Sequence, residues 1–234
     1  MAYHITRNDA QQEGTYGITG KNNKIYLSRP HFMQILIGSR YITDNEEKNY
    51  GHSALRVFIK GKVDIIYDFG RYGETDGEKR ITGEGILRIW KNSSKKYFDT
   101  EKTYGKKLKR TTSGYTYYIT NDECKNIINF FIDLEKEKRT SIPGKFDEYK
   151  LTSNYHAITF NCTTLTLEGA KKAKKEIIYH PFLFRKYIGL STEEALGARI
   201  YIPLNPNIIF MPEDLRAMLK GNKVLKYDKE TNNL

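Results

Sequence analysis

The stretch FNCTTL places Cys162 where a cysteine can act as a nucleophile. A short apolar run ends just before it, and Leu165, Gly169, Ala170 and Ala173 then recur at helical spacing. This pattern predicts a helix that begins at or next to Cys162. The N–H groups and the dipole of a helix N-terminus stabilise a thiolate, and the same N–H groups can stabilise an oxyanion. Cys162 is therefore a candidate nucleophile for acyl transfer.

The second cysteine has a different sequence environment. Cys124 shares one helical face with Ile127, Ile128, Phe131 and Leu134, so we expect it to be a core residue. Two cysteines are too few for a disulfide framework in a chain of this size, and they do not have zinc spacing. Because no other cluster has metal-ligand spacing, neither a metal nor a cofactor is expected.

A nucleophilic cysteine needs a base, and the base needs a group that orients it. Three histidines could serve as the base: His52, His156 and His180. His156 lies six residues before Cys162, on the segment that leads into the predicted helix. His180 precedes a proline in a loop, and His52 opens a predicted strand. A lone histidine at a strand end is more often structural than catalytic, so spacing alone leaves the role of each histidine open.

The strand that His52 opens has a clear partner. Residues 52–59 and 63–69 are joined by a short connection centred on a glycine, which is typical of a hairpin. In such a hairpin His52 faces the far end of the second strand, where Asp68 can accept a hydrogen bond from the imidazole. Asp64 lies too near the turn for this role. Cys162, His52 and Asp68 thus form a chemically sensible triad.

The other elements are predicted from periodicity and capping signals. A capping box opens the clearest helix, 120–139, and further strands are predicted at 86–90 and 114–119. A short helix is predicted after Ser191, and another from Pro212 to Gly221. The remaining segments are expected to be irregular: a loose start at 1–24, a solvated loop or ribbon at 91–110, a loop at 140–153, a strand or loop at 200–210, and a frayed tail at 222–234.

Composition limits the class of protein. The chain has 234 residues, 38% hydrophobic and 13% aromatic, which suits a folded domain. No apolar run is long enough for a membrane helix, and the first residues lack the pattern of a secretory signal, so we expect synthesis in the cytoplasm without a signal peptide. The net charge of +11 favours anionic partners. No nucleic-acid-binding motif is present, so no specific nucleic acid is expected.

Three stretches carry a resemblance to a known family: YGHSALRV, IIYDFGRYG and FNCTTL. In their order, with Gly-His first and Asn-Cys late, the chain resembles the circularly permuted NlpC-type papain-fold hydrolases, which include YiiX-like and lecithin retinol acyltransferase-like proteins. The resemblance implies an α+β fold in which a papain-like antiparallel sheet packs against helices, with the catalytic cysteine at a helix N-terminus. It also implies one catalytic domain over 1–234, with its core at about 50–175 and a C-terminal extension at 180–221 before the tail.

The resemblance also assigns roles to individual residues. Cys162 becomes the nucleophile, His52 the base and Asp68 the third polar residue, a position that varies among relatives. Tyr50, His156 and Asn161 become candidate substrate-binding residues. Each has a structural alternative: Tyr50 as a packed aromatic, His156 as a core residue and Asn161 as the residue that shapes the turn into the helix.

Within the family, the first hypothesis is a peptidoglycan amidase or endopeptidase. The positive charge suits an anionic cell wall, and the missing signal suits a bacterial effector delivered by a secretion system to the periplasm of a target cell. Such a toxin would have an immunity protein as a partner. The alternative with the same chemistry is a lipid or protein acyl hydrolase, acyltransferase or deamidase. A further alternative is a non-catalytic module that binds polyanions through 91–110, which carries eight basic and two acidic residues.

Overall fold

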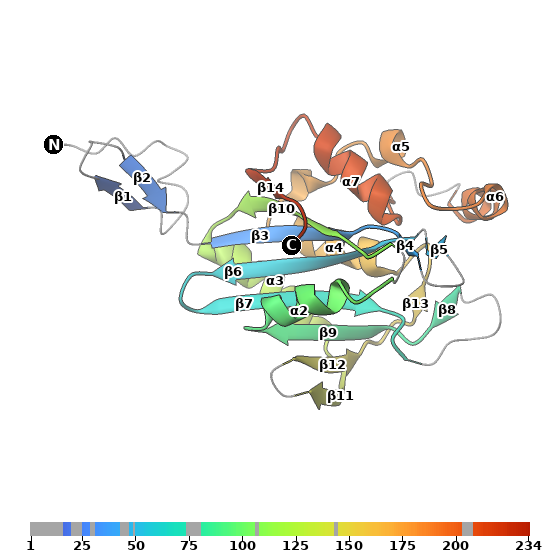
Figure 1. The fold of residues 1–234 in the computed structure, drawn as a ribbon, viewed down its shortest axis with the longest axis horizontal. Coiled ribbons are helices and arrows are strands. Elements are labelled where there is room, and N and C mark those ends of the chain that lie inside the picture. The colour runs from blue at the N-terminus through green and yellow to red at the C-terminus, as the bar shows by residue number, and fades with distance from the viewer. Residues whose placement is uncertain are drawn as a thin grey trace.

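The computed structural model describes residues 16–19, 25–28, 31–42, 47–48, 50–73, 81–105, 108–142, 145–202 and 208–234. They form an α+β fold built on one large antiparallel sheet, as the sequence predicts (Figure 1). None of the helices in these ranges is long and apolar enough to cross a membrane. Most of the predicted loose start, and residues 203–207 of the predicted strand or loop at 200–210, lie outside the described residues.

The large sheet has eight strands in the order β11-β12-β9-β7-β6-β3-β10-β14, and every neighbouring pair is antiparallel. Its strands are β3 (His31–Gly38), β6 (His52–Ile59), β7 (Val63–Gly70), β9 (Ile86–Lys91), β10 (Thr112–Tyr118), β11 (Glu137–Ile142), β12 (Phe146–Lys150) and β14 (Lys229–Thr231). Three small pairs stand apart from it: β1 (Tyr16–Thr19) with β2 (Ile25–Ser28), β4 (Tyr41–Ile42) with β5 (Glu47–Lys48), and β8 (Thr82–Gly83) with β13 (Tyr155–His156).

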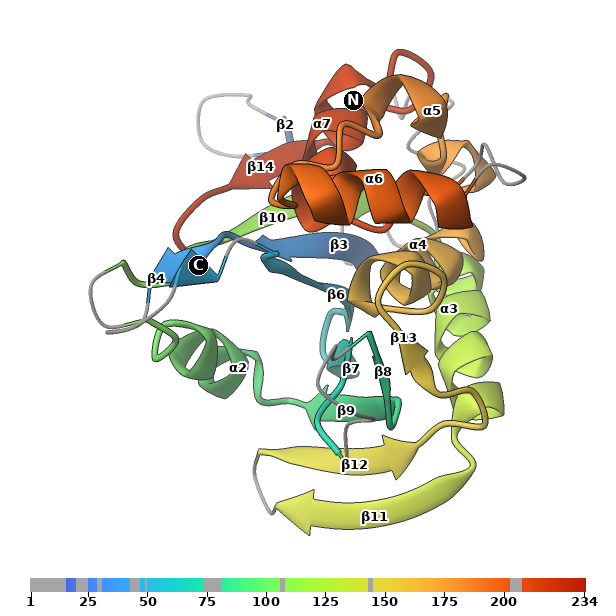
Figure 2. The ribbon, with the colours of Figure 1, turned by 90° about the vertical axis from the view of Figure 1, so that its right-hand side faces the viewer.

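Helices cover both faces of the large sheet. They are α2 (Ser94–Glu101), α3 (Asn121–Leu134), α4 (Cys162–Lys171), α5 (Pro181–Phe184), α6 (Thr192–Tyr201) and α7 (Pro212–Gly221), with a short 3-10 helix, η1 (Lys175–Ile177). Figure 2 shows α2 on one side of the sheet and α3 and α4 on the other. The larger apolar core lies on the α3 and α4 side, and a smaller one that includes Trp90 and Tyr97 lies under α2.

The β6–β7 hairpin has the predicted form. Its register pairs Leu55 with Tyr67 and Ile59 with Val63, and Gly61 in the turn has a φ of +73°, a conformation that suits glycine. Side chains alternate along β6, so Leu55 enters the larger core while Ala54 enters the smaller one. His52 is the first residue of this central strand, and the alternation places it on the same face as Ala54.

Two predictions for the middle of the chain are wrong. The helix predicted at 120–139 has its capping box but ends at Leu134, because Glu135 is extended. The chain then forms β11 and β12, which occupy most of the predicted loop at 140–153 and extend the sheet beyond β9. β11 is an edge strand of the large sheet. Its sequence is charged and lacks the apolar alternation that predicts a strand, because an edge strand keeps its polar side chains in water.

Two further segments that the sequence predicts to be irregular form a helix and a strand, which long-range contacts stabilise. The predicted loop or ribbon at 91–110 contains α2, which is anchored by the buried ring of Tyr97 and by the hydrogen bond from Ser94 to Asp64 (2.8 Å). The predicted frayed tail contains β14, which pairs with β10 from Gly114 to Thr116. The helices predicted after Ser191 and from Pro212 to Gly221 are confirmed as α6 and α7.

Candidate active site

Cys162 is the first residue of α4, as the sequence predicts. Asn161 caps the helix: its Oδ1 accepts the N–H groups of Thr163 (2.9 Å) and Thr164 (3.0 Å), and the Thr164 hydroxyl accepts the N–H of Asn161 (2.8 Å). The Asn161 amide also donates to the carbonyl oxygens of Ala157 (2.5 Å) and Phe210 (3.0 Å). Asn161 therefore fixes the turn that presents Cys162. Since Cys162 is the first helical residue, its own N–H has no partner within the helix.

The hairpin brings His52 to Asp68, where the predicted register puts it. His52 Nε2 lies 2.7 Å from Asp68 Oδ1, and the two residues are only 8% and 3% exposed. His52 also lies close enough to Cys162 for its charge and hydrogen-bonding capacity to lower the pKa of the thiol. Because Nε2 is engaged by Asp68, Nδ1 is the ring nitrogen left for the thiol. The three predicted triad residues thus lie together in one chain of polar contacts. Asp64, near the turn, instead pairs with Arg56 (2.8 Å).

The electrostatics of these three residues favour an ion pair. Burial raises the pKa of the Cys162 thiol, but the charge and hydrogen bond of His52 outweigh this effect, so the pKa of Cys162 lies below its ordinary value. Burial likewise lowers the pKa of His52, but Asp68 and Cys162 outweigh it, and the net pKa of His52 is well above its ordinary value. These directions favour a thiolate beside an imidazolium.

Two residues that the sequence analysis did not single out support Asp68. The hydroxyl of Tyr72 donates to Asp68 Oδ1 (2.8 Å), and the Arg88 guanidinium carbon lies 3.6 Å from the centre of the Tyr72 ring. Burial raises the pKa of Asp68, yet His52, Tyr72 and Arg88 together bring it below its ordinary value. Tyr72 can fold back because residue 70 is glycine: a Cβ there would lie 2.8 Å from ring atoms of Tyr72. In the sequence, only Gly70 at the end of this strand indicated such a reversal.

Ser53 is the third contributor that sequence reasoning missed. Its backbone and its side chain both contribute to lowering the pKa of the Cys162 thiol. Its hydroxyl also donates to Thr163 Oγ1 (3.2 Å), which ties β6 to the first turn of α4. The available signal was alternation along the strand: Ser53 shares a face with Leu55, which enters the core on the side of α4.

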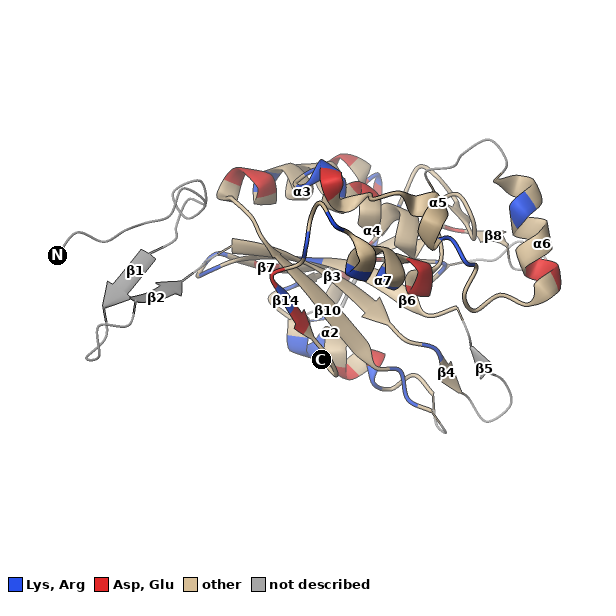
Figure 3. Cartoon of the chain, turned by 90° about the horizontal axis from the view of Figure 1, so that it is seen from above, with Lys and Arg blue, Asp and Glu red and all other residues tan. Residues whose placement is uncertain are grey.

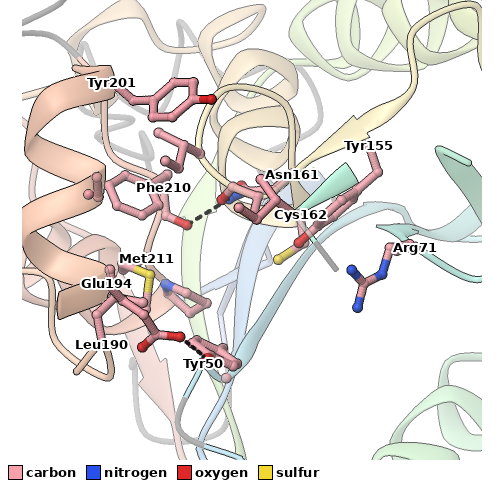
Figure 4. A pocket seen from close by; sticks show the side chains of 17 residues that line it. Tyr50, Arg71, Tyr155, Asn161, Cys162, Leu190, Glu194, Tyr201, Phe210 and Met211 are labelled. Atoms are coloured by element: carbon pink, nitrogen blue, oxygen red, sulfur yellow. Dashed lines mark hydrogen bonds between the residues drawn. The ribbon is translucent and has the colours of Figure 1, made fainter. Parts of the chain in front are cut away.

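Cys162 lines a cavity of about 340 Å³ (Figure 4). On one side lie apolar residues of α6, of the segment before α6 and of the segment before α7, among them Leu190, Ala198, Phe210 and Met211. Arg71 and Tyr155 lie on the other side of Cys162 in Figure 4. Asn161 and Tyr50 also line the cavity. The volume is within the range of small-molecule pockets.

Tyr50 lines this cavity with its hydroxyl already engaged. It donates to Glu194 (2.5 Å), and this hydrogen bond, together with burial and the charge of Glu194, raises the pKa of Tyr50 to about 12. The sequence left two roles open for Tyr50, substrate binding and aromatic packing. The structure adds a third role: Tyr50, just before β6, links this strand to α6, which forms one wall of the cavity. In this structure its proton is directed to Glu194 rather than to Cys162.

The other candidate histidines and the second cysteine lie elsewhere. His156 is not among the cavity-lining residues, and its Nδ1 accepts the N–H groups of Ile158 and Thr159 (both 3.2 Å), so it shapes the turn before α4. His180 precedes α5, with its ring against Tyr179. Cys124 is fully buried in the larger core, as predicted, and burial raises its pKa to about 12.

Comparison with known proteins returns no relative: no protein-family model, no curated protein and no solved structure matches the chain. Within the part of the chain that the structure describes, no group of three or more His, Cys, Asp or Glu side chains is arranged to hold a metal ion. The site is therefore interpreted from its own geometry.

Proposed function

We propose that this protein is a cysteine hydrolase that acts on amide or ester bonds through an acyl-enzyme. One observation carries the proposal. Cys162 lies at the N-terminus of α4 and lines a cavity, His52 lowers the pKa of its thiol, and His52 Nε2 is 2.7 Å from Asp68. A nucleophile, a base and an orienting acid in this order are the parts that nucleophilic acyl transfer requires.

The reaction has two balanced steps. The Cys162 thiolate attacks the carbonyl carbon, an S–C bond forms, and the C–N or C–O bond breaks as protonated His52 gives its proton to the leaving group. In the second step His52 takes a proton from water, the resulting hydroxide attacks the thioester, and the S–C bond breaks to release the acid. The N–H of Cys162 at the helix start is the donor best placed for the oxyanion of each step.

The permuted NlpC-type papain fold is part of the same proposal. Three features support it: the order His52, Asp68, Cys162 along the chain, the antiparallel hairpin that carries the first two, and the cysteine at a helix start packed against that sheet. In a permuted enzyme of this kind the histidine precedes the cysteine. The hypothesis that the protein is an effector that attacks the cell wall depends on this fold assignment.

Two substrate classes are open to this chemistry. The net charge of +11 supports amide bonds of an anionic cell wall, with delivery to the periplasm of a target cell and an immunity protein as partner. The apolar side of the cavity supports an acyl ester or amide with a hydrocarbon chain. The lining favours the second class, because most of the side chains that α6 and its flanking segments contribute to the cavity are apolar.

Parallel assays with the wild type and Cys162→Ala test the proposal. Purified peptidoglycan and p-nitrophenyl octanoate are the substrates, and mass spectrometry of quenched protein detects an acyl group on Cys162. We expect cleavage by the wild type only, with the acyl group on Cys162. The control Cys124→Ala retains activity, since Cys124 lies in the core away from the cavity. Equal turnover by the wild type and by Cys162→Ala would contradict the proposal.

A further inference from the structure

Large apolar side chains that remain in contact with water are concentrated in one segment of this protein. Within the part of the chain that the structure describes, most of them lie between the start of α5 and the end of α6: Phe182, Leu183, Ile188, Leu196, Ile200 and Tyr201. Single exposed apolar residues need no explanation, but a concentration of them marks a surface that binds a partner or a membrane. This segment is therefore a candidate interaction surface.

Helix α6 presents apolar residues both to the cavity and to solvent. Ala198 is buried, and Gly197 and Tyr201 line the cavity. Leu196 and Ile200 are four residues apart, so they share one face of the helix, and they are 60% and 71% exposed. Figure 3 shows α6 at the right-hand edge of the molecule, with charge only in its acidic first turn and at one basic residue near its end. A helix that only closed a cavity would have a polar outer face.

The exposed face of α6 is continuous with the cavity. Tyr201 lines the cavity and is also 64% exposed, and the same is true of Ile81, which is 37% exposed. Gly197 follows Leu196 and lies at the cavity, and a Cβ at Gly197 would meet no atom within 4 Å. The apolar lining of the cavity therefore extends onto the outer surface at α6.

We propose that Leu196 and Ile200 form a docking surface for a lipid bilayer with anionic headgroups, from which an acyl substrate enters the cavity beside Cys162. In this arrangement α6 lies along the membrane surface, the two side chains insert among the acyl chains, and Tyr201 at the mouth of the cavity faces the lipid. The docking rests on α6 alone, whereas the delivery of substrate rests on the proposed function.

Charge favours a bilayer over a second copy of this chain as the occupant. The chain carries a net charge of +11, so two copies repel each other, whereas anionic headgroups attract the protein. Apolar insertion and electrostatic attraction together hold helices at membrane surfaces. The exposed ring of Tyr201 is a further argument, because tyrosine is enriched where a membrane meets water.

Co-sedimentation with lipid vesicles tests the docking surface. The probes are vesicles of phosphatidylcholine alone and vesicles that also contain phosphatidylglycerol. We expect the wild type to bind the anionic vesicles more tightly than the neutral ones. The double variant Leu196→Gln/Ile200→Gln should bind the anionic vesicles at least tenfold more weakly, because two apolar side chains no longer leave water. Glutamine is a good helix former, so α6 is retained.

Ile132→Gln is the matched control, because Ile132 is an apolar residue of α3 that is 52% exposed. It should bind the vesicles like the wild type. Failure of the wild type to bind the anionic vesicles, or equal binding by the double variant, would overturn the proposal. Sedimentation velocity without vesicles tests the other occupant: a dimer of the wild type that the double variant does not form would assign this face to a second copy, and the lipid proposal would be wrong.

Substrate delivery is measured as a ratio of two rates. One is the cleavage of p-nitrophenyl palmitate held in the anionic vesicles, and the other is the cleavage of p-nitrophenyl octanoate in solution. The ratio should fall at least tenfold in the double variant and stay unchanged in Ile132→Gln. Equal losses toward both esters would mean that Leu196 and Ile200 only stabilise the cavity, and the proposal would fail.

Vesicle binding requires no turnover, so failure of this inference can be distinguished from failure of the proposed function. If binding depends on Leu196 and Ile200 while Cys162 cleaves neither ester, the docking surface is confirmed and the hydrolase proposal fails. If Cys162 cleaves the octanoate ester while the wild type binds no vesicles, the hydrolase is confirmed and the docking surface is wrong.

Discussion

At the scale of single residues, Cys162 and Cys124 are the same side chain in opposite environments. Cys124 is surrounded by the apolar core and its pKa is raised to about 12, whereas the partners of Cys162 lower its pKa. We therefore expect iodoacetamide at pH 6 to modify Cys162 at least tenfold faster than a free cysteine peptide, while Cys124 stays unmodified. Peptide mapping of alkylated protein measures both sites in one sample, and a rate at Cys162 no faster than the peptide would contradict the ion pair.

Asp68 controls the upper end of the pH range. The ion pair exists above the lowered pKa of Cys162 and below the raised pKa of His52, so the profile of kcat/KM should be bell-shaped with a broad top. Asp68→Asn removes a charge that raises the pKa of His52. The imidazolium is then lost at lower pH, so the basic limb should move to lower pH and activity at pH 7 should fall by about 100-fold. An unmoved basic limb would exclude Asp68 as the partner of His52.

Tyr72 acts one step further from the substrate, as a positioning residue. Tyr72→Phe keeps the ring beside Arg88 but removes the donor to Asp68. We expect about a tenfold loss in kcat with KM unchanged, because a hydrogen bond to a charged group is lost. The decisive measurement is the pH profile of kcat/KM. If Tyr72 orients Asp68, the pH range of activity should become narrower in Tyr72→Phe, whereas a purely structural role would leave the shape of the profile unchanged.

At the scale of elements, the start of α4 is the part on which the chemistry depends. Asn161→Ala removes the cap and leaves the carbonyl oxygens of Ala157 and Phe210 without their amide donor. We expect a loss of about 1–2 kcal/mol of unfolding free energy and a larger relative loss of activity, because Cys162 is displaced. Ser191→Ala, at the matching capping box of α6, is the control. It should cost similar stability, measured by urea denaturation, but spare alkylation of Cys162.

The sequence predicts the elements whose signals are local. The β6–β7 hairpin, the cap of α3 and the helix that starts at Cys162 each follow from a few neighbouring residues, and together they place His52, Asp68 and Cys162. The support from Tyr72 and Arg88 could not be predicted, because it requires a reversal after Gly70 and pairing of β7 with β9. The strands β11, β12 and β14 were missed for the same reason: pairing with distant strands determines polar edge segments more than their own pattern does.

At the scale of the whole molecule, the chain closes one edge of the sheet with its last residues. β14 pairs with β10, the Asp228 carboxylate accepts the N–H of Tyr118 (2.7 Å), and the N–H of Leu234 donates to Thr112 O (3.1 Å). Leu234 also packs against the smaller core under α2. These contacts cover backbone groups of β10 that would otherwise form an exposed edge, and exposed edges pair with other chains.

Deletion of residues 229–234 tests this role. β10 would become the edge strand, and its buried Tyr115, which pairs with Glu230 and donates to the Glu230 carboxylate (3.2 Å), would lose cover. We expect a lower Tm, by about 4–8 °C for each 2 kcal/mol lost in a chain of this size, and concentration-dependent aggregation seen by light scattering. Below the transition, alkylation of Cys162 should stay fast, because β3 and β10 separate β14 from β6. If the truncated protein kept its Tm and its solubility, β14 would be a peripheral addition; if Cys162 became inert while the fold persisted, the site would depend on the whole sheet and not only on the hairpin and α4.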